Sequence, residues 1–94
     1  MKIEYTRHLK LKLLIRKFPE NYPRLIFAEP EFKLVNSSTN HGIAIKKLFY
    51  NEKERYLMIA YDIVNEIAKI ITIHPISKND VDNRLKIGRW KNEK

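Results

Sequence analysis

The spacing of apolar residues along the first third of the chain predicts two helices. Thr6 is a suitable N-cap for the first, which is predicted over residues 7–18 and is ended by Pro19. A second, short helix is predicted over residues 22–28, with Pro23 at its first position, where the missing N–H costs little. The apolar positions that follow i, i+3, i+4 and i+7 spacing, and so share one face of the first helix, are Leu11, Leu14, Ile15 and Phe18.

The middle of the chain has the alternation and the β-branched content of strands. Residues 55–64 are apolar at both alternating sets of positions, which is typical of a central strand covered on two faces. The next run is rich in isoleucine and ends at His74. Strict alternation predicts that His74 shares a face with Thr72 and Ile70. The four strands predicted from these patterns span residues 31–35, 43–50, 55–64 and 67–74.

A third helix is predicted towards the C-terminal end. Ser77 is its expected N-cap, and Asp80, three residues later, partly resembles the acidic member of a capping box. Gly88 suits the position just after the helix. The order of elements predicts one α+β domain over residues 1–94, with two N-terminal helices, an antiparallel sheet of about four strands and a C-terminal helix. The helices are expected to cover one side of the sheet, and residues 3–5 are a candidate for a further short strand.

The net charge narrows the partners that such a domain would bind. Nineteen Lys and Arg residues against eleven Asp and Glu give the 94-residue chain a formal charge of +8. This excess favours a polyanion such as nucleic acid, and maintenance of solubility is the alternative explanation.

Several other classes of site are not predicted. The chain has no Cys, its three His residues show no metal-ligand spacing, and it has no glycine-rich phosphate loop, so neither a metal nor a cofactor is expected. No apolar run approaches the length of a membrane span, and the N-terminus lacks the apolar core of a signal peptide. A cytoplasmic location without membrane contact is therefore expected.

A cationic ridge accompanies the apolar positions of the first helix. His8, Lys12 and Arg16 are spaced i, i+4 and i+8, which suits contacts with phosphate groups. The alternative is an ordinary solvated helix face. A third histidine, His41, lies in the polar turn at residues 36–42 and is expected at the surface.

A second group of candidates surrounds the end of the last predicted strand. His74 precedes a proline and could act as a general acid or base, or could fasten the strand to the last helix through its ring nitrogens. Arg84 follows Asp80 by four residues, so an ion pair within the helix competes with a phosphate contact. Trp90 is expected either to pack on the domain, which would fix Arg89 in place, or to stack on a nucleobase.

Two segments of the chain resemble a known family. "EYTRHLKLKLLIRKFPENYPRLIFAEPEF" and "MIAYDIVNEIAKIITIHPISKNDVDNRLKIGRW" together resemble small microbial domains of uncharacterised function related to the RelE/ParE and BrnT toxin superfamily. The pieces that carry the resemblance most specifically are His8…Arg16 and His74-Pro75…Arg84…Gly88-Arg89-Trp90. The resemblance implies a RelE-like fold with two helices and four strands. It also implies metal-independent RNA cleavage, in which the ribose 2′-hydroxyl attacks the adjacent phosphate, or, as in some members, inhibition of gyrase.

The resemblance also implies roles for individual residues. His8 or His74 would transfer the proton. The groups that would hold the phosphate and stabilise its developing charge are Lys12, Arg16, Arg84 and Arg89, and further contacts with RNA would come from Arg7, Trp90 and Lys91. The leading hypothesis is a toxin-type, metal-independent endoribonuclease that acts on free or ribosome-bound RNA as a monomer or homodimer. The alternatives are a non-catalytic nucleic-acid-binding domain and a domain that binds an acidic antitoxin protein.

Overall fold

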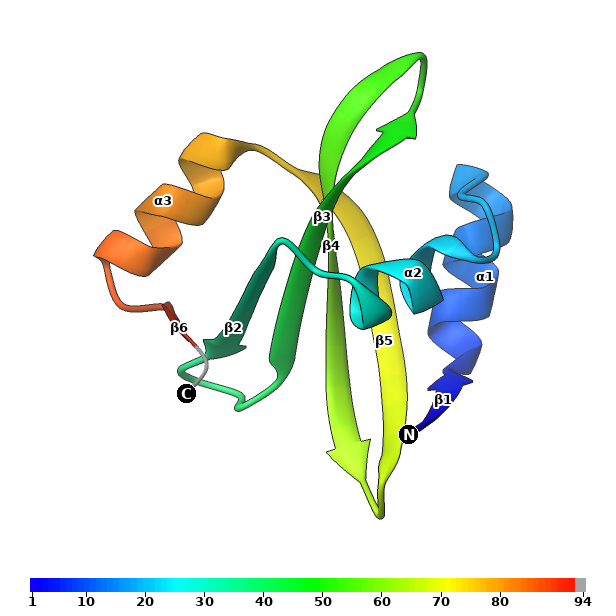
Figure 1. Ribbon diagram of the computed structural model, residues 1–94, viewed down its shortest axis with the longest axis horizontal. Helices are drawn as coiled ribbons and strands as arrows, with labels where there is room; N and C mark the ends of the chain where they lie inside the picture. Colours follow the sequence, from blue (N-terminus) through cyan, green and yellow to red (C-terminus); the bar gives the residue numbers. More distant parts are fainter. Residues whose placement is uncertain (93–94) are drawn as a thin grey trace.

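A computed structural model of the chain describes residues 1–92, which form three helices and one six-stranded sheet (Figure 1). The elements in chain order are β1 Lys2–Tyr5, α1 Arg7–Arg16, α2 Tyr22–Ala28, β2 Phe32–Asn36, β3 Gly42–Tyr50, β4 Lys53–Val64, β5 Ile67–Ile76, α3 Lys78–Lys86 and β6 Trp90–Asn92. The three predicted helices and four predicted strands are therefore present close to their expected bounds.

The sheet is larger than predicted, and it is mixed instead of antiparallel. Its strand order is β1-β5-β4-β3-β2-β6, with β1 parallel to β5 and every other pair antiparallel. The prediction of a RelE-like sheet of about four antiparallel strands is therefore wrong. Two short strands lie at the edges: β1, of four residues, matches the further strand suggested at residues 3–5, whereas β6, of three residues, was not predicted. Such short strands form on an existing sheet edge, and too few residues alternate for a clear sequence pattern.

The helices cover both faces of the sheet, whereas the sequence had predicted one covered face. Figure 1 shows α1 and α2 on one side and α3 on the other. On β4, Leu57 and Ile59 point into the core beneath α1 and α2, while Met58 points into the core beneath α3. Because β4 is apolar on both faces, each face needs a cover. Its predicted central position is confirmed, since it lies between β5 and β3.

Helix α1 buries a different face from the one predicted. Leu9 and Leu13 are buried against the sheet. Of the predicted face, Leu11, Leu14 and Ile15 are instead 53%, 77% and 72% exposed, whereas Phe18, which follows the helix, is buried. Thr6 fixes this orientation, because its backbone N–H and its hydroxyl donate to carbonyl oxygens of β5, at 3.1 and 3.2 Å. The helix therefore starts in a rotation that turns Leu9 and Leu13 inward.

The predicted N-caps and the predicted glycine after the last helix are confirmed, whereas α1 ends at Arg16, two residues earlier than predicted. The Thr6 hydroxyl accepts the N–H of Leu9 at 3.2 Å, and the Ser77 hydroxyl accepts the N–H of Asp80 at 3.0 Å. Both are N-caps of the expected kind. Gly88 follows α3 with a φ of 83°, a left-handed conformation that glycine adopts without strain.

A β-bulge in β5 overturns the predicted alternation before His74. Thr72 lies opposite Ala60 and Ile70 lies opposite Tyr61, so one extra residue separates them on β5. Ile70 therefore points into the core beneath α1 and α2. Thr72 and His74 point to the opposite face, because His74 lies opposite Met58. The prediction that His74, Thr72 and Ile70 share a face is wrong for Ile70.

Gly42→Ala is expected to lower the free energy of unfolding by about 1–3 kcal/mol. A Cβ at Gly42 would lie 2.3 Å from Cζ of Tyr61, whose ring is buried and packs edge-on against Phe27 at 5.0 Å between centroids. Urea denaturation measures the change. Gly88→Asn is the matched control, because a Cβ there meets nothing within 4 Å and Asn tolerates a positive φ. Equal stabilities for Gly42→Ala and the wild type would contradict the prediction.

Candidate functional site

The candidate site lies along the part of β5 that β1 does not cover. β1 pairs with β5 only over residues 67–70, and α1 packs beside β5. From α1, the Nζ atom of Lys12 donates a hydrogen bond to Oγ1 of Thr72 at 3.1 Å. Burial, followed by the nearby charge of Arg16, lowers the pKa of the Lys12 ammonium. This contact brings a positive charge from α1 to the β5 strand.

His74 lies one alternation further along the same face of β5. Its side chain is half-buried. Burial lowers its pKa, and the charges of Lys12, Arg84 and Arg16 lower it further. These charges come from α1 and α3, on opposite sides of the sheet. We call Lys12, Arg16, His74 and Arg84 the β5 cluster, and all four were candidates from the sequence.

The lowered pKa of His74 gives a pH-dependent contribution to stability. The unfolded imidazole titrates near 6.5, and the folded one titrates below that value. Between the two values the unfolded state binds more protons, so stability falls as the pH falls below 6.5. Urea denaturation should therefore show that the free energy of unfolding falls more between pH 7.5 and pH 5 in the wild type than in His74→Gln. His41→Gln serves as the control, and equal losses in wild type and His74→Gln would contradict the assignment.

Arg84 and Trp90 form a stacked pair beneath α3. The Arg84 guanidinium lies 4.7 Å from the centroid of the Trp90 ring. The intrahelical ion pair of α3 joins Lys78 to Asp82, at 3.1 Å from Nζ to Oδ1, in place of the expected pairing of Arg84 with Asp80. Trp90 is only 2% exposed, so its ring packs in the core and holds Arg84.

The cationic ridge of α1 lines a shallow groove. His8, Lys12 and Arg16 share this groove of about 290 Å³ with Leu11 and Ile15. The i, i+4, i+8 spacing therefore places the three side chains along one surface, as expected for a helix. His8 is exposed, and the charges that act on His74 are those of Lys12, Arg84 and Arg16.

Arg89 and Lys91 lie away from His74 and Thr72 on β5. β6 pairs with β2, and Trp90 lies opposite Asn36. Four strand spacings separate β6 from β5 in the sheet order, which corresponds to about 19 Å. Arg89 is held at that far edge, because its carbonyl oxygen accepts the N–H of Ser37 at 2.8 Å. The remaining candidate, Arg7, is exposed at the start of α1.

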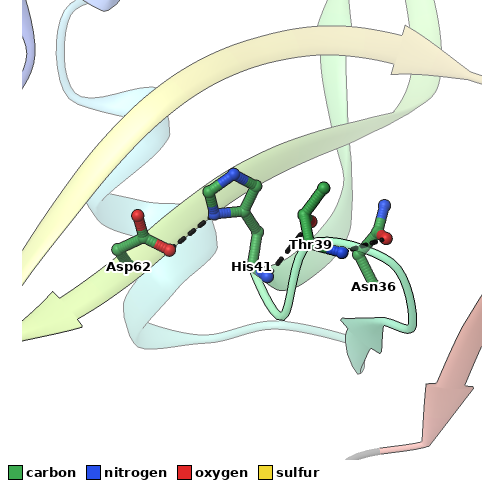
Figure 2. A network of polar contacts seen from close by, with 4 residues as sticks. All are labelled: Asn36, Thr39, His41 and Asp62. Atoms are coloured by element: carbon green, nitrogen blue, oxygen red, sulfur yellow. Dashed lines mark hydrogen bonds and ion pairs between the residues drawn. The ribbon is translucent and has the colours of Figure 1, made fainter.

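The structure also contains a His–Asp pair that the sequence did not indicate (Figure 2). Nδ1 of His41 lies 2.6 Å from Oδ1 of Asp62, and the side chains are 36% and 42% exposed. The turn before His41 is held by Asn36, whose Oδ1 accepts the N–H of Thr39 at 3.1 Å, and by Thr39, whose hydroxyl accepts the N–H of His41 at 3.3 Å. The hairpin register was the available signal: Gly42 lies opposite Tyr61, so the preceding residue falls beside Asp62.

Comparisons with known proteins add no relatives. No protein-family model, no curated protein and no solved structure matches the chain. Nothing in these comparisons links it to the RelE/ParE/BrnT superfamily. Across residues 1–92, no three His, Cys, Asp or Glu side chains gather as a metal site requires. In the same range, no helix has the length and apolar character of a membrane span.

Proposed function

We propose that this protein binds RNA through the β5 cluster. The observation that carries the proposal is that every charged group acting on the half-buried His74 is a cation. Three like charges around one imidazole repel one another and the protonated ring, which is unfavourable in the free protein. A bound phosphate relieves that repulsion, because the side chains would become its hydrogen-bond donors.

A polyanion explains the surface better than a single phosphate ion. The net charge is +8, and the sequence of α1 contains no Asp or Glu. α1 also carries Arg7 and Lys10, which on a helical wheel lie across its exposed apolar residues from Lys12 and Arg16. A strand with phosphates at regular intervals would contact several of these cations and release counterions from each. RNA, free or on the ribosome, has this form, and it would be met in the cytoplasm.

Metal-independent RNA cleavage is a second candidate, favoured by the neutral form of His74. An imidazole with a lowered pKa is unprotonated at neutral pH and can accept the proton of a ribose 2′-hydroxyl. The 2′-oxygen then bonds to phosphorus, giving a 2′,3′-cyclic phosphate, and the P–O5′ bond breaks. The 5′-oxygen takes a proton from Lys12, whose pKa is also lowered. Arg16 and Arg84 would stabilise the charge that develops on the phosphoryl oxygens.

Fluorescence anisotropy with a labelled, mixed-sequence, single-stranded RNA tests the binding proposal. Lys12→Ala, Arg16→Ala and Arg84→Ala should each weaken binding and make the slope of log K against log salt shallower by about 0.7. Lys53→Ala and Lys86→Ala are matched controls on exposed lysines outside the cluster. Equal losses in the cluster and control variants would reject the β5 cluster as the binding site.

Incubation with long RNA in EDTA, with and without ribosomes, tests cleavage. Wild type should produce 2′,3′-cyclic phosphate ends, and His74→Ala should not, while His41→Ala serves as the matched histidine control. Binding without cleavage in both settings would remove the catalytic candidate and leave RNA binding in place.

A further inference from the structure

The outer face of α1 exposes three aliphatic side chains next to one another. Leu11, Leu14 and Ile15, spaced i, i+3 and i+4, are 53%, 77% and 72% exposed. We call these three residues the α1 stripe. Single exposed aliphatic residues are common on proteins, but three adjacent ones on one helix face form a patch of the kind found at interfaces. Burial of Leu9 and Leu13 fixes α1 in this rotation, so the stripe cannot turn inward.

Positive charges border the α1 stripe on both sides. On a helical wheel, Lys10 lies beside Leu14 on one side and Lys12 follows Ile15 on the other, while Arg7 lies one turn before Leu11, between the directions of Leu14 and Leu11. Lys17 continues the basic surface just past the last helical residue. The surface is therefore aliphatic along its middle and cationic along its margins.

The groove next to the stripe gives the surface a concave part. It measures about 290 Å³, and Leu11 and Ile15 of the stripe form part of its wall together with His8, Lys12 and Arg16. An aliphatic side chain from a partner could lie between Leu11 and Ile15 with its neighbouring residues next to the cations. Amphipathic helices commonly bind with their apolar face in a hydrophobic groove.

We propose that the α1 stripe binds an acidic amphipathic helix of a partner protein. The aliphatic face of that helix would cover Leu11, Leu14 and Ile15. Its Asp and Glu residues would lie against the basic margins of α1, which would accelerate association and fix the register. The stripe would provide the buried apolar contacts, and the basic margins would favour partners with acidic sequences.

The charge of α1 makes other occupants of the stripe less suitable. A second copy of the chain bound through the same face would bring two basic margins together, and like charges would oppose the contact. A nucleic acid strand would use the cations and leave three aliphatic side chains in water. An anionic membrane would suit both features, but a flat surface would not use the groove between Leu11 and Ile15.

Such a partner would compete with RNA, if RNA binds where we propose. Lys12 and Arg16 belong both to the groove and to the β5 cluster. An acidic helix on the stripe would therefore occupy two of the cations that the phosphate needs. The docking proposal itself depends only on the stripe and its margins.

Selection from a displayed library of helix-forming peptides, with the full chain as bait, tests the docking proposal. Enriched peptides should carry an aliphatic face and an excess of Asp and Glu. Their affinity should fall at least about tenfold for Leu14→Ser and for Ile15→Ser. Ile87→Ser is the matched control, because Ile87 is also strongly exposed (61%) but lies at the end of α3. Vesicles with and without phosphatidylglycerol form a second arm.

Each outcome decides for or against the proposal. Acidic amphipathic peptides that lose affinity for the stripe variants but keep it for Ile87→Ser would support it. Enriched peptides indifferent to the stripe variants, or no enrichment, would overturn it, as would stripe-dependent binding to vesicles without peptide binding. Leu14→Ser should leave RNA affinity within about twofold, since Leu14 carries no charge. Failure of docking and failure of RNA binding are therefore separately visible.

Discussion

Reversing two charges of the β5 cluster, in the double variant Lys12→Glu/Arg16→Glu, should lower RNA affinity about 100-fold at 100 mM salt. Each substitution removes a cation that acts on His74 and places a carboxylate where a phosphate would bind. The loss should shrink as salt rises, because screening weakens both the attraction in the wild type and the repulsion in the variant. Anisotropy titrations at several salt concentrations measure it, and circular dichroism checks the fold of the variant.

Lys53→Glu/Lys86→Glu is the decisive comparison for this charge reversal. Both lysines are exposed and lie outside the cluster, and the net charge changes by the same amount. If total charge alone attracts RNA, the two double variants should lose affinity equally. If the β5 cluster binds the phosphates, the control should retain most of its affinity. The outcome separates a local site from a basic protein without one.

The components of the β5 cluster could be named from the sequence, but their arrangement could not. Helical periodicity is regular, so Lys12 and Arg16 were correctly placed on one surface of α1. The approach of that surface to His74 depends on α1 packing beside β5, which no local pattern encodes. The bulge in β5 made strand periodicity misleading. One extra residue changed the face of every side chain on one side of it, so the predicted alternation failed there.

The rotation of α1 shows why the predicted apolar face was wrong. The helix has apolar residues on more than one side, so its spacing is compatible with two buried faces. The choice between them is made by Thr6, which bonds to β5 and turns Leu9 and Leu13 towards the sheet. The exposed stripe is thus a consequence of tertiary anchoring, and it became visible only when the burial of each side chain was known.

The C-terminal candidates were separated by a strand too short to predict. Arg84 and Arg89 are close in sequence, and the chain was expected to deliver both beside His74. β6 instead pairs with β2 and keeps Arg89 at the far edge, while Arg84 reaches the cluster from α3. Trp90 connects β6 to α3, because it packs in the core while its ring supports Arg84.

Trp90→Ala should therefore have the largest effect on stability, a loss of about 3–5 kcal/mol in the free energy of unfolding. The ring is 2% exposed in the core beneath α3, and a small domain has only about 5–15 kcal/mol in total. Truncation leaves a cavity and removes the surface on which Arg84 lies. Urea denaturation followed by circular dichroism measures the loss, and a change below about 1 kcal/mol would contradict the packing described for Trp90.

Trp90→Phe separates the packing role of the ring from its support of Arg84. Phe keeps an apolar ring in the core, so part of the lost stability should return. Its smaller ring attracts a guanidinium less strongly than the indole does. At a temperature where both variants are folded, RNA affinity should fall in the order wild type, Trp90→Phe, Trp90→Ala, because Arg84 is progressively less fixed. Equal affinities in all three would mean that Arg84 contributes to RNA binding without help from Trp90, and that the contact between Trp90 and Arg84 is structural only.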